Sequence, residues 1–289
     1  VEDSPVGRLG AKMSGCNTMF INEPNDIDEK LIDKIQNMDS KKIDSSLNTY
    51  INKDLNVLIP MAGRGSRFAD KGYVFPKPLI EVKGKPMIQL VVENLNIEAN
   101  YTFIVLQEHI EKYNIDQMLK LIKPNSNIVI TDGITEGAAS TTLLAKEFIN
   151  NEAPLIIANS DQFIEWNPSE VLYSFMNKNV DGGILTFSAT HPKWSYAKIN
   201  NEGLVTEVAE KNPISSHATV GVYFWKKGLD YVDSAEDMIN KNIRVNDEFY
   251  VCPVYNQGIK AGKKFVINEI DKMWGIGTPE DLENFLREY

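Results

Sequence analysis

The sequence predicts an α/β protein with a Rossmann-like, mixed but mostly parallel sheet flanked by helices. Short apolar runs such as Leu55–Pro60 and Leu155–Ala158 have the length and composition of strands covered on both faces. Helical patterns lie between such runs: Pro86–Leu95 begins with a proline, which favours the first helical turn, and Ile110–Ile122 carries an apolar stripe. This alternation is typical of βαβ units.

The remaining elements are expected in chain order. The expected strands share β-branched and aromatic residues and are Thr102–Leu106, Asn127–Thr131, Gly183–Thr190, Leu204–Val208, Ala218–Trp225 and Lys264–Ile270. One helix is expected near Phe249–Ile259, and another after Thr278, where Thr-Pro-Glu-Asp is typical of a helix N-terminus. Fewer helices separate the later strands, so we expect β elements inserted into the α/β pattern.

Composition limits the function classes. The chain has 289 residues, 43% of them hydrophobic, and a net charge of -10. An acidic chain is a poor polyanion binder, so no nucleic-acid partner is expected, and no apolar run is long enough for a membrane helix. Cys16 and Cys252 lie far apart and form no metal-binding spacing with the three histidines. We expect free thiols and a cytoplasmic protein.

The most informative segment runs from Asn56 to Leu79 and combines a buried strand, a glycine loop and cationic side chains. Gly63 and Gly65 let backbone N–H groups approach an anion closely. Arg64, Arg67 and Lys77 add positive charge, and the prolines on both sides of Lys77 restrict its backbone. A P-loop or a dinucleotide fingerprint is excluded, because neither glycine pattern is present. The alternative is an ordinary turn with incidental arginines.

This segment resembles the signature of the nucleotidyltransferases that activate sugar phosphates and related phosphomonoesters: a strand, then G-x-G-[ST]-R, then P-K-P-L. The resemblance continues in order to about Leu286 and implies a GT-A-like Rossmann fold. It implies that Arg67 stabilises the α- and β-phosphates and that Lys77 neutralises charge at the α-phosphate. It also assigns nucleotide binding to the loop residues Met61, Ala62, Gly63, Gly65 and Ser66.

Asp161 follows the strand Leu155–Ala158, at the sheet edge where α/β proteins bind ligands. The resemblance makes Asp161 a catalytic residue and a Mg²⁺ ligand, although an aspartate in a strand-end turn is the simpler alternative. Family members carry a second aspartate where this chain has Gly275. The metal is then held either by Asp161 and phosphates alone or with a replacement such as Asp271 or Asp247.

Three shorter motifs complete the resemblance. Glu136, Gly137 and Ala138 match a turn against which the nucleotide base lies, although a small-residue helix start is the alternative. Glu210 and Lys211 match an acceptor-binding motif in which the inserted Asn212 is a departure. Gly221 matches a strand glycine that approaches the acceptor; a bulge glycine is its alternative.

The resemblance therefore implies transfer of a nucleoside monophosphate, from CTP or GTP in preference, to a sugar phosphate or similar phosphomonoester, with release of pyrophosphate. Bacterial surface polysaccharide synthesis is the expected context. The competing hypothesis is a glycosyltransferase-like or non-catalytic protein that binds a nucleotide sugar. A homo-oligomer is left open by the sequence.

Domain boundaries follow from these assignments. Residues 55–289 are the expected nucleotidyltransferase domain, and residues 22–54, rich in Asn, Asp, Lys and Ser, are the expected linker with one short helix. Residues 1–21 resemble the last motif of haloacid-dehalogenase-like phosphatases, with the acidic pair Glu2 and Asp3. The nucleophile of that family would lie upstream, so we expect no phosphatase activity from this remnant.

Overall fold

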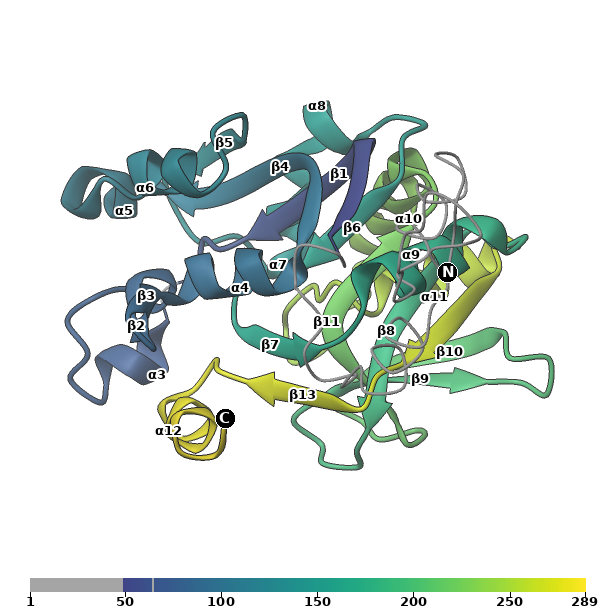
Figure 1. Ribbon diagram of the computed structural model, residues 1–289. Coiled ribbons are helices and arrows are strands. Elements are labelled where there is room, and N and C mark those ends of the chain that lie inside the picture. The colour runs from purple at the N-terminus through teal and green to yellow at the C-terminus, as the bar shows by residue number, and fades with distance from the viewer. Residues whose placement is uncertain (1–48, 64) are drawn as a thin grey trace, which may run out of the picture.

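A computed structural model describes residues 49–63 and 65–289 (Figure 1). The predicted phosphatase remnant and all but the last residues of the predicted linker lie outside the described residues. Within the described part, no helix combines the length and the apolar character that crossing a bilayer requires.

One nine-stranded sheet forms the centre of the molecule, with the strand order β10-β9-β11-β6-β1-β4-β5 and with β8 joined to both β11 and β12. The strands are β1 (Tyr50–Pro60), β4 (Ile97–Leu106), β5 (Asn127–Thr131), β6 (Leu155–Ala158), β8 (Gly182–Ser188), β9 (Ser195–Ile199), β10 (Val205–Glu210), β11 (His217–Trp225) and β12 (Phe265–Glu269). β5, β4, β1 and β6 are parallel neighbours. β11 then runs antiparallel to β6, β8 and β9, and β10 antiparallel to β9. All strands except β10 and β11 therefore point the same way, which confirms the predicted mixed, mostly parallel sheet.

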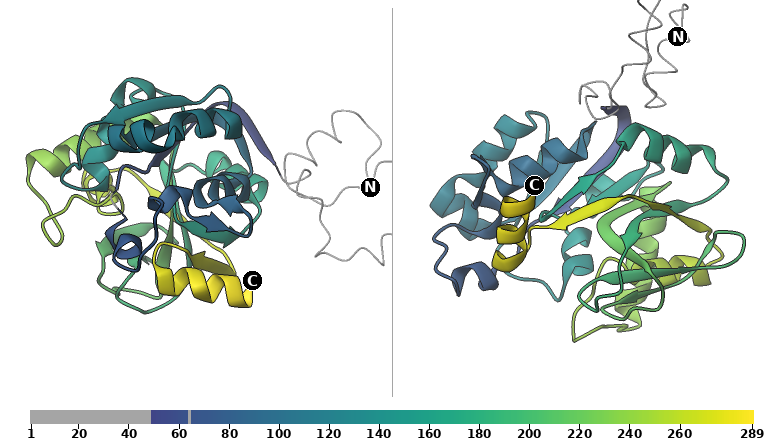
Figure 2. Two further views of the ribbon diagram at one scale, coloured as in Figure 1. Left: turned by 90° about the vertical axis from the view of Figure 1, so that its left-hand side faces the viewer. Right: turned by 60° about the horizontal axis from the view of Figure 1, so that its bottom comes forward.

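Helices cover both faces of this sheet, as Figures 1 and 2 show. On β1, Val57 and Ile59 belong to one buried cluster and Leu58 to the other, because successive strand residues point to opposite faces. The longer helices that contribute to the first cluster are α4 (Met87–Leu95), α6 (Ile115–Ile122), α9 (Pro168–Asn177) and α12 (Pro279–Glu288). The helices of the second cluster are α7 (Ala138–Leu143), α8 (Lys146–Ile149), α10 (Gly228–Asn240) and α11 (Val254–Lys260).

The C-terminal segment returns to the N-terminal side of the domain. β13 (Lys272–Gly275) pairs antiparallel with β7 (Gln162–Glu165), the strand that follows β6. α12 then lies beside the short helix α3 (Ser66–Ala69) and the ribbon formed by β2 (Glu81–Val82) and β3 (Lys85–Pro86), as Figures 1 and 2 show. An ion pair of 3.4 Å between Lys71 and Glu280 joins the two segments. Residues from both ends of the domain thereby meet at one edge of the sheet.

Most predicted elements are confirmed, and the differences have local causes. The expected helix Ile110–Ile122 is two helices, α5 (Gln107–Tyr113) and α6, because Asn114 adopts a left-handed conformation with φ 51°. The helix expected from Phe249 begins only at Val254. The Phe249 backbone instead accepts from Ala139 and donates to Glu136, which holds it against α7.

The sequence correctly predicted a strand at β1 and a helix at α12. β1 extends five residues further toward the N-terminus than the apolar run predicted, and Tyr50 and Ile51 pair with the start of β4 before a shift in register. The predicted N-cap is confirmed, since Thr278 accepts from the backbone N–H of Asp281 at 3.2 Å. Two helices, α9 and α10, were not predicted from the sequence.

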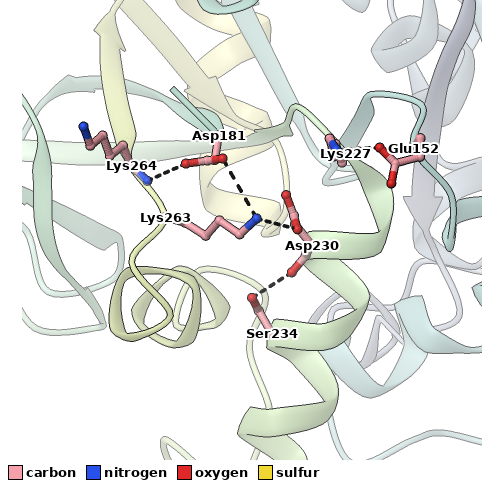
Figure 3. A network of polar contacts seen from close by, with 7 residues as sticks. All are labelled: Glu152, Asp181, Lys227, Asp230, Ser234, Lys263 and Lys264. Carbon is pink, nitrogen blue, oxygen red and sulfur yellow. Dashed lines mark hydrogen bonds and ion pairs between the residues drawn. The ribbon is translucent and has the colours of Figure 1, made fainter. Parts of the chain in front are cut away.

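The end of β8, β11 and β12 that includes Gly182, Trp225 and Phe265 is joined to α10 by side chains (Figure 3). Lys263 forms a 2.7 Å ion pair with the buried Asp230 and approaches Asp181 at 4.0 Å. Asp181 also accepts from the backbone N–H of Lys264 at 2.8 Å. The network lies at the Trp225 end of β11, and none of its residues lines the two cavities described below.

Candidate active site

Two cavities open where β1 and β6 end, at the edge where the parallel strands give way to β11. This is the place where open α/β sheets bind ligands. We call them the glycine-loop cavity, of about 280 Å³, and the β11 cavity, of about 210 Å³.

The glycine-loop cavity is built largely from backbone and small side chains. Its described lining is Pro60, Met61, Ala62, Gly63, Lys77, Ile134, Thr135, Gly137, Ala138, Thr141, Ser160 and Glu248. Gly137 has φ 134°, and a Cβ there would lie 2.5 Å from the backbone of Phe249. Only glycine therefore fits this close approach of two backbone segments. Lys77 is the single cation among the described residues that line the cavity.

The β11 cavity has a more strongly charged lining. It brings together Arg67, Asn159, Asp161, Gln162, Lys193, Trp194, Ser195, Glu210, Thr219, Val220, Gly221, Tyr223, Met273, Gly275, Gly277, Thr278 and Asp281. Gly221 has φ 79°, and a side chain there would collide with Asn159. Two cations and three carboxylates share the cavity, which suits a small polar ligand that carries both donors and acceptors.

An ion pair joins the two cavities. Lys77 lines the glycine-loop cavity, Asp161 lines the β11 cavity, and Lys77 Nζ lies 2.9 Å from Asp161 Oδ2. Their side chains are 22% and 27% exposed, so both charges remain accessible to ligands from either side. The pair marks the place where molecules bound in the two cavities would meet.

Lys77 is positioned by its neighbours. It begins a 3-10 turn, Lys77–Leu79, with Pro76 before it at φ −62° and Pro78 inside it. Gly65 has φ 62°, and a Cβ at Gly65 would lie 2.9 Å from the Cβ of Lys77. The glycine loop thus packs directly on the lysine, which explains why the loop and the proline-flanked lysine occur together in the sequence.

Asp161 is held by strands on both sides. The Asn159 N–H donates to the Gly221 carbonyl at 2.8 Å, and the Asp161 carbonyl accepts from the Ile276 N–H at 2.9 Å. A side chain at Gly277 would collide with the Asp161 carboxylate. The segment from Asn159 to Asp161 is therefore held between β11 and the turn from β13 to α12, while the Asp161 carboxylate stays partly exposed.

Glu210 lies at the end of β10 with its carboxylate in the β11 cavity, where it accepts a short hydrogen bond from Ser195 Oγ. Burial raises the pKa of Glu210, against the opposing effects of Ser195 and Lys211. Tyr223, behind it, is fully buried and its pKa is also raised by burial. This wall of the cavity thus disfavours negative charge.

The structure distributes the predicted nucleotide-binding and catalytic residues as follows. Met61, Ala62, Gly63, Gly137 and Ala138 line the glycine-loop cavity with Lys77, whereas Arg67 lines the β11 cavity beside Asp161. Gly65 and Ser66 line a separate cavity of about 420 Å³ between the loop and α5. Glu136 lies outside both cavities, where its carboxylate pairs with Arg244 at 3.0 Å.

The predicted acceptor residues are divided as well. Glu210 and Gly221 line the β11 cavity. Lys211, with φ 54°, lies outside both cavities and donates to the Tyr250 hydroxyl at 2.6 Å.

Four residues that line the cavities were not predicted as site residues: Lys193, Trp194, Asp281 and Glu248. Lys193 and Trp194 precede β9, a strand that the pattern did not reveal. Asp281 had been noted only as part of a helix start. No local signal connects Lys193, Trp194 and Asp281, because they meet in the β11 cavity only through the pairing of β7 with β13 and of β9 with β11. Glu248 lines the glycine-loop cavity instead.

The described residues contain no group of three or more His, Cys, Asp or Glu side chains arranged to hold a metal on its own. Mg²⁺ needs less, because one or two carboxylates suffice when phosphate oxygens complete its shell. The β11 cavity fits that requirement, since Asp161 and Asp281 both line it. Neither Asp271 nor Asp247 lines either of the two cavities.

Residues 56–288 match the family model described as nucleotidyl transferase. The chain belongs to this family. It is similar to a mannose-1-phosphate guanyltransferase of Schizosaccharomyces pombe, with 26% identity over 208 residues, 67% of this chain and 57% of the relative. It is also similar to the low-salt glycan biosynthesis nucleotidyltransferase Agl11 of Haloferax volcanii, with 25% identity over 76% of this chain and 62% of the relative. The chain thus spans a little over half the length of these curated relatives.

Solved structures confirm the fold of this family member. A nucleoside-diphosphate-sugar pyrophosphorylase from Vibrio cholerae RC9 superposes with a TM-score of 0.70 at 24% identity, and the match covers 80% of this chain and all of that one. An inositol-1-phosphate CTP transferase from T. maritima superposes with a TM-score of 0.64 at 12% identity, over 81% of this chain and 96% of that one.

Proposed function

We propose that the protein transfers a nucleoside monophosphate from a nucleoside triphosphate to a sugar phosphate or similar phosphomonoester. The observation that carries this proposal is the Lys77–Asp161 ion pair between two cavities, one with a glycine loop and one with a polar lining. A binding protein needs one such cavity, whereas a transferase must bring two substrates together at one point. Mannose-1-phosphate guanyltransferase, the name of one relative, describes a reaction of this kind.

In the proposed reaction, a phosphate oxygen of the acceptor attacks the α-phosphorus of the triphosphate. The bond from the α-phosphorus to the bridging oxygen breaks, and pyrophosphate leaves with that oxygen. A phosphate dianion is already nucleophilic near neutral pH, so the protein needs to position the groups and neutralise charge. Lys77 and Arg67 would stabilise charge at the phosphates. Asp161 would hold Mg²⁺, which supplies further positive charge when bound.

Glu248 supports a preference for CTP or GTP. Glu248 lines the glycine-loop cavity, and an ionised carboxylate only accepts hydrogen bonds. Cytosine, guanine and adenine carry exocyclic amino groups that donate, whereas uracil and thymine carry none, so this argument disfavours UTP and dTTP. We propose that Glu248 favours the amino-bearing bases. The name of the Schizosaccharomyces pombe relative, a guanyltransferase, is the reason for including GTP in this choice.

We further propose that the product feeds glycan or surface polysaccharide synthesis, in line with the name of the Haloferax relative. Because that use draws on cellular nucleoside triphosphates, we place the enzyme in the cytoplasm.

The test is pyrophosphate release from CTP, GTP, UTP and dTTP with a panel of sugar 1-phosphates and other phosphomonoesters. Lys77→Ala and Asp161→Ala should each lower kcat/KM by at least about a hundredfold, about 2.7 kcal/mol, if they stabilise charge in the transition state. Lys71→Ala, which removes a cation outside the two cavities, is the matched control. Full turnover in either site variant would refute these roles. Binding of a nucleotide sugar without turnover of any triphosphate would support a glycosyltransferase-like protein instead.

A further inference from the structure

The β11 cavity carries a second aspartate carboxylate, that of Asp281, which the sequence motifs did not reveal. β7 and β13 pair so that Gly275 lies opposite Gln162, the residue after Asp161. The resemblance implies an aspartate at position 275, beside Asp161. Glycine leaves that place without a side chain.

Asp281 reaches the same place from the first turn of α12. A Cβ built on Gly275 would lie 3.1 Å from Cη2 of Trp194, 3.6 Å from Asp281 Oδ2 and 3.8 Å from Asp281 Cγ. The space next to Gly275 is therefore bordered by the Trp194 ring and by the Asp281 carboxylate. Thr278 accepts from the Asp281 N–H and so fixes the start of the helix that carries this carboxylate.

Each of the two carboxylates, those of Asp161 and Asp281, forms an ion pair with a lysine. Asp161 pairs with Lys77 at 2.9 Å, and Asp281 pairs with Lys193 at 2.8 Å. Both aspartates line the β11 cavity. Each lysine supplies a positive charge where a bound cation would supply one.

A third polar group of this cavity lacks a partner. Gln162 is 3% exposed, lines the same cavity, and neither Oε1 nor Nε2 forms a hydrogen bond. A buried amide without partners destabilises the folded protein unless a ligand or water satisfies it. This orphaned amide points independently to a polar ligand at the wall shared by Asp161 and Gly275.

We propose that Asp281 is the second carboxylate of the divalent cation site, in place of the aspartate missing at Gly275. The proposal rests on the proposed function, because the cation would bind carboxylates together with triphosphate oxygens. Carboxylate and amide oxygens match the preference of Mg²⁺ for hard ligands. Lys193 is then a competitor for Asp281, and its ion pair opens when the cation binds.

Cation affinity can be measured without turnover. Mn²⁺ is titrated into the full chain with a CTP or GTP analogue that has a methylene group between the α- and β-phosphates, and free Mn²⁺ is followed by electron paramagnetic resonance. Asp281→Asn should weaken Mn²⁺ binding by about tenfold or more. Asp271→Asn, a matched loss of an exposed carboxylate, should leave it unchanged.

Two further variants test whether Asp281 is a ligand of the cation or only forms the ion pair with Lys193. Lys193→Met breaks the same ion pair but keeps the carboxylate, so Mn²⁺ affinity should be unchanged or higher. The double variant Asp281→Asn/Gly275→Asp should recover affinity, because the new carboxylate is placed in the same space.

Unchanged affinity in Asp281→Asn, or an equal loss in Lys193→Met, would overturn the proposal. These outcomes leave pyrophosphate release by the unaltered protein untouched. Conversely, if the unaltered protein turned over no triphosphate, the proposed function would fail, whatever the Mn²⁺ titrations gave. Circular dichroism melting of each variant checks the fold.

Discussion

The two halves of the sheet provide the two cavities in different ways. In the half built from β1, β4 and β5, consecutive parallel strands deliver a glycine loop, and the glycine-loop cavity is lined mainly by backbone and small side chains. In the half built from β8 to β11, antiparallel strands deliver larger polar and aromatic side chains to the β11 cavity. A backbone-built cavity suits a ligand part shared by all triphosphates, whereas side chains can be exchanged to suit different acceptors.

Among the substitutions that compare the two halves, the largest effect is expected where the backbone itself forms the wall of the cavity. Gly137→Ala would place a Cβ 2.5 Å from the Phe249 backbone at φ 134°, so the turn must shift or strain. We expect a loss of at least about 2 kcal/mol in the free energy of unfolding or of nucleotide binding, since such backbone strain costs about 1–3 kcal/mol before any clash.

Gly133→Ala is the control for this substitution, because no atom lies within 4 Å of a Cβ there. Urea unfolding and calorimetry with CTP and GTP measure the two effects. If Gly137→Ala and Gly133→Ala had the same free energy of unfolding and the same nucleotide affinity, the glycine-loop cavity would tolerate an added side chain. The proposed difference between a backbone-built cavity and a side-chain-built cavity would then be wrong.

A smaller effect should distinguish two lysines in the acceptor half. Lys193 lines the β11 cavity, whereas Lys211, the cation that the motif predicts for the acceptor phosphate, lies outside it and contacts Tyr250. We expect Lys193→Met to raise the acceptor KM by about tenfold, about 1.4 kcal/mol, through loss of a charge-assisted contact.

Lys211→Met should change the same constant by less than about threefold, since a solvated ion contact contributes about 0–1 kcal/mol. Steady-state kinetics at saturating triphosphate measure both. A larger increase in acceptor KM for Lys211→Met than for Lys193→Met would indicate that Lys211 moves into the β11 cavity when the acceptor binds. The sequence motif would then have predicted the acceptor-binding lysine correctly.

Two lysine–aspartate pairs show how far the candidate site could be predicted from the sequence. Lys77 and Asp161 were identified because local rules place each one: prolines fix the lysine, and the end of a buried strand fixes the aspartate. Lys193 and Asp281 lie 88 residues apart and meet at 2.8 Å only because separate strand pairings bring β9 and α12 to one cavity. No motif encodes such a contact.

The secondary structure likewise divides into elements with a clear local sequence pattern, which were predicted, and elements without one, which were not. Strands with continuous apolar runs, such as β5 and β6, were predicted with the bounds that the structure shows. α10 was missed, and its length of 13 residues did not help, because polar residues interrupt its apolar pattern. Asn114 ended a helix that the apolar stripe alone would have continued, because asparagine tolerates the left-handed conformation.

The smallest expected effect concerns pH and belongs to the acceptor half. Burial raises the pKa of Glu210 above its ordinary value of 4.5. The folded protein therefore keeps a proton that the unfolded chain has already lost. Consequently, the free energy of unfolding should fall as pH rises from about 4.5 through the raised folded pKa, by at most about 1.4 kcal/mol per pH unit.

Glu210→Gln keeps the oxygen that accepts from Ser195 but cannot ionise, so this part of the pH dependence should disappear. Glu207→Gln changes an exposed carboxylate on the same strand and should retain it. Urea unfolding at a series of pH values from 4 to 8 measures the difference. If the Glu210→Gln curve kept the slope of the unaltered protein, Glu210 would ionise freely in its cavity, and the wall beside Tyr223 would be as permissive to negative charge as the surface is.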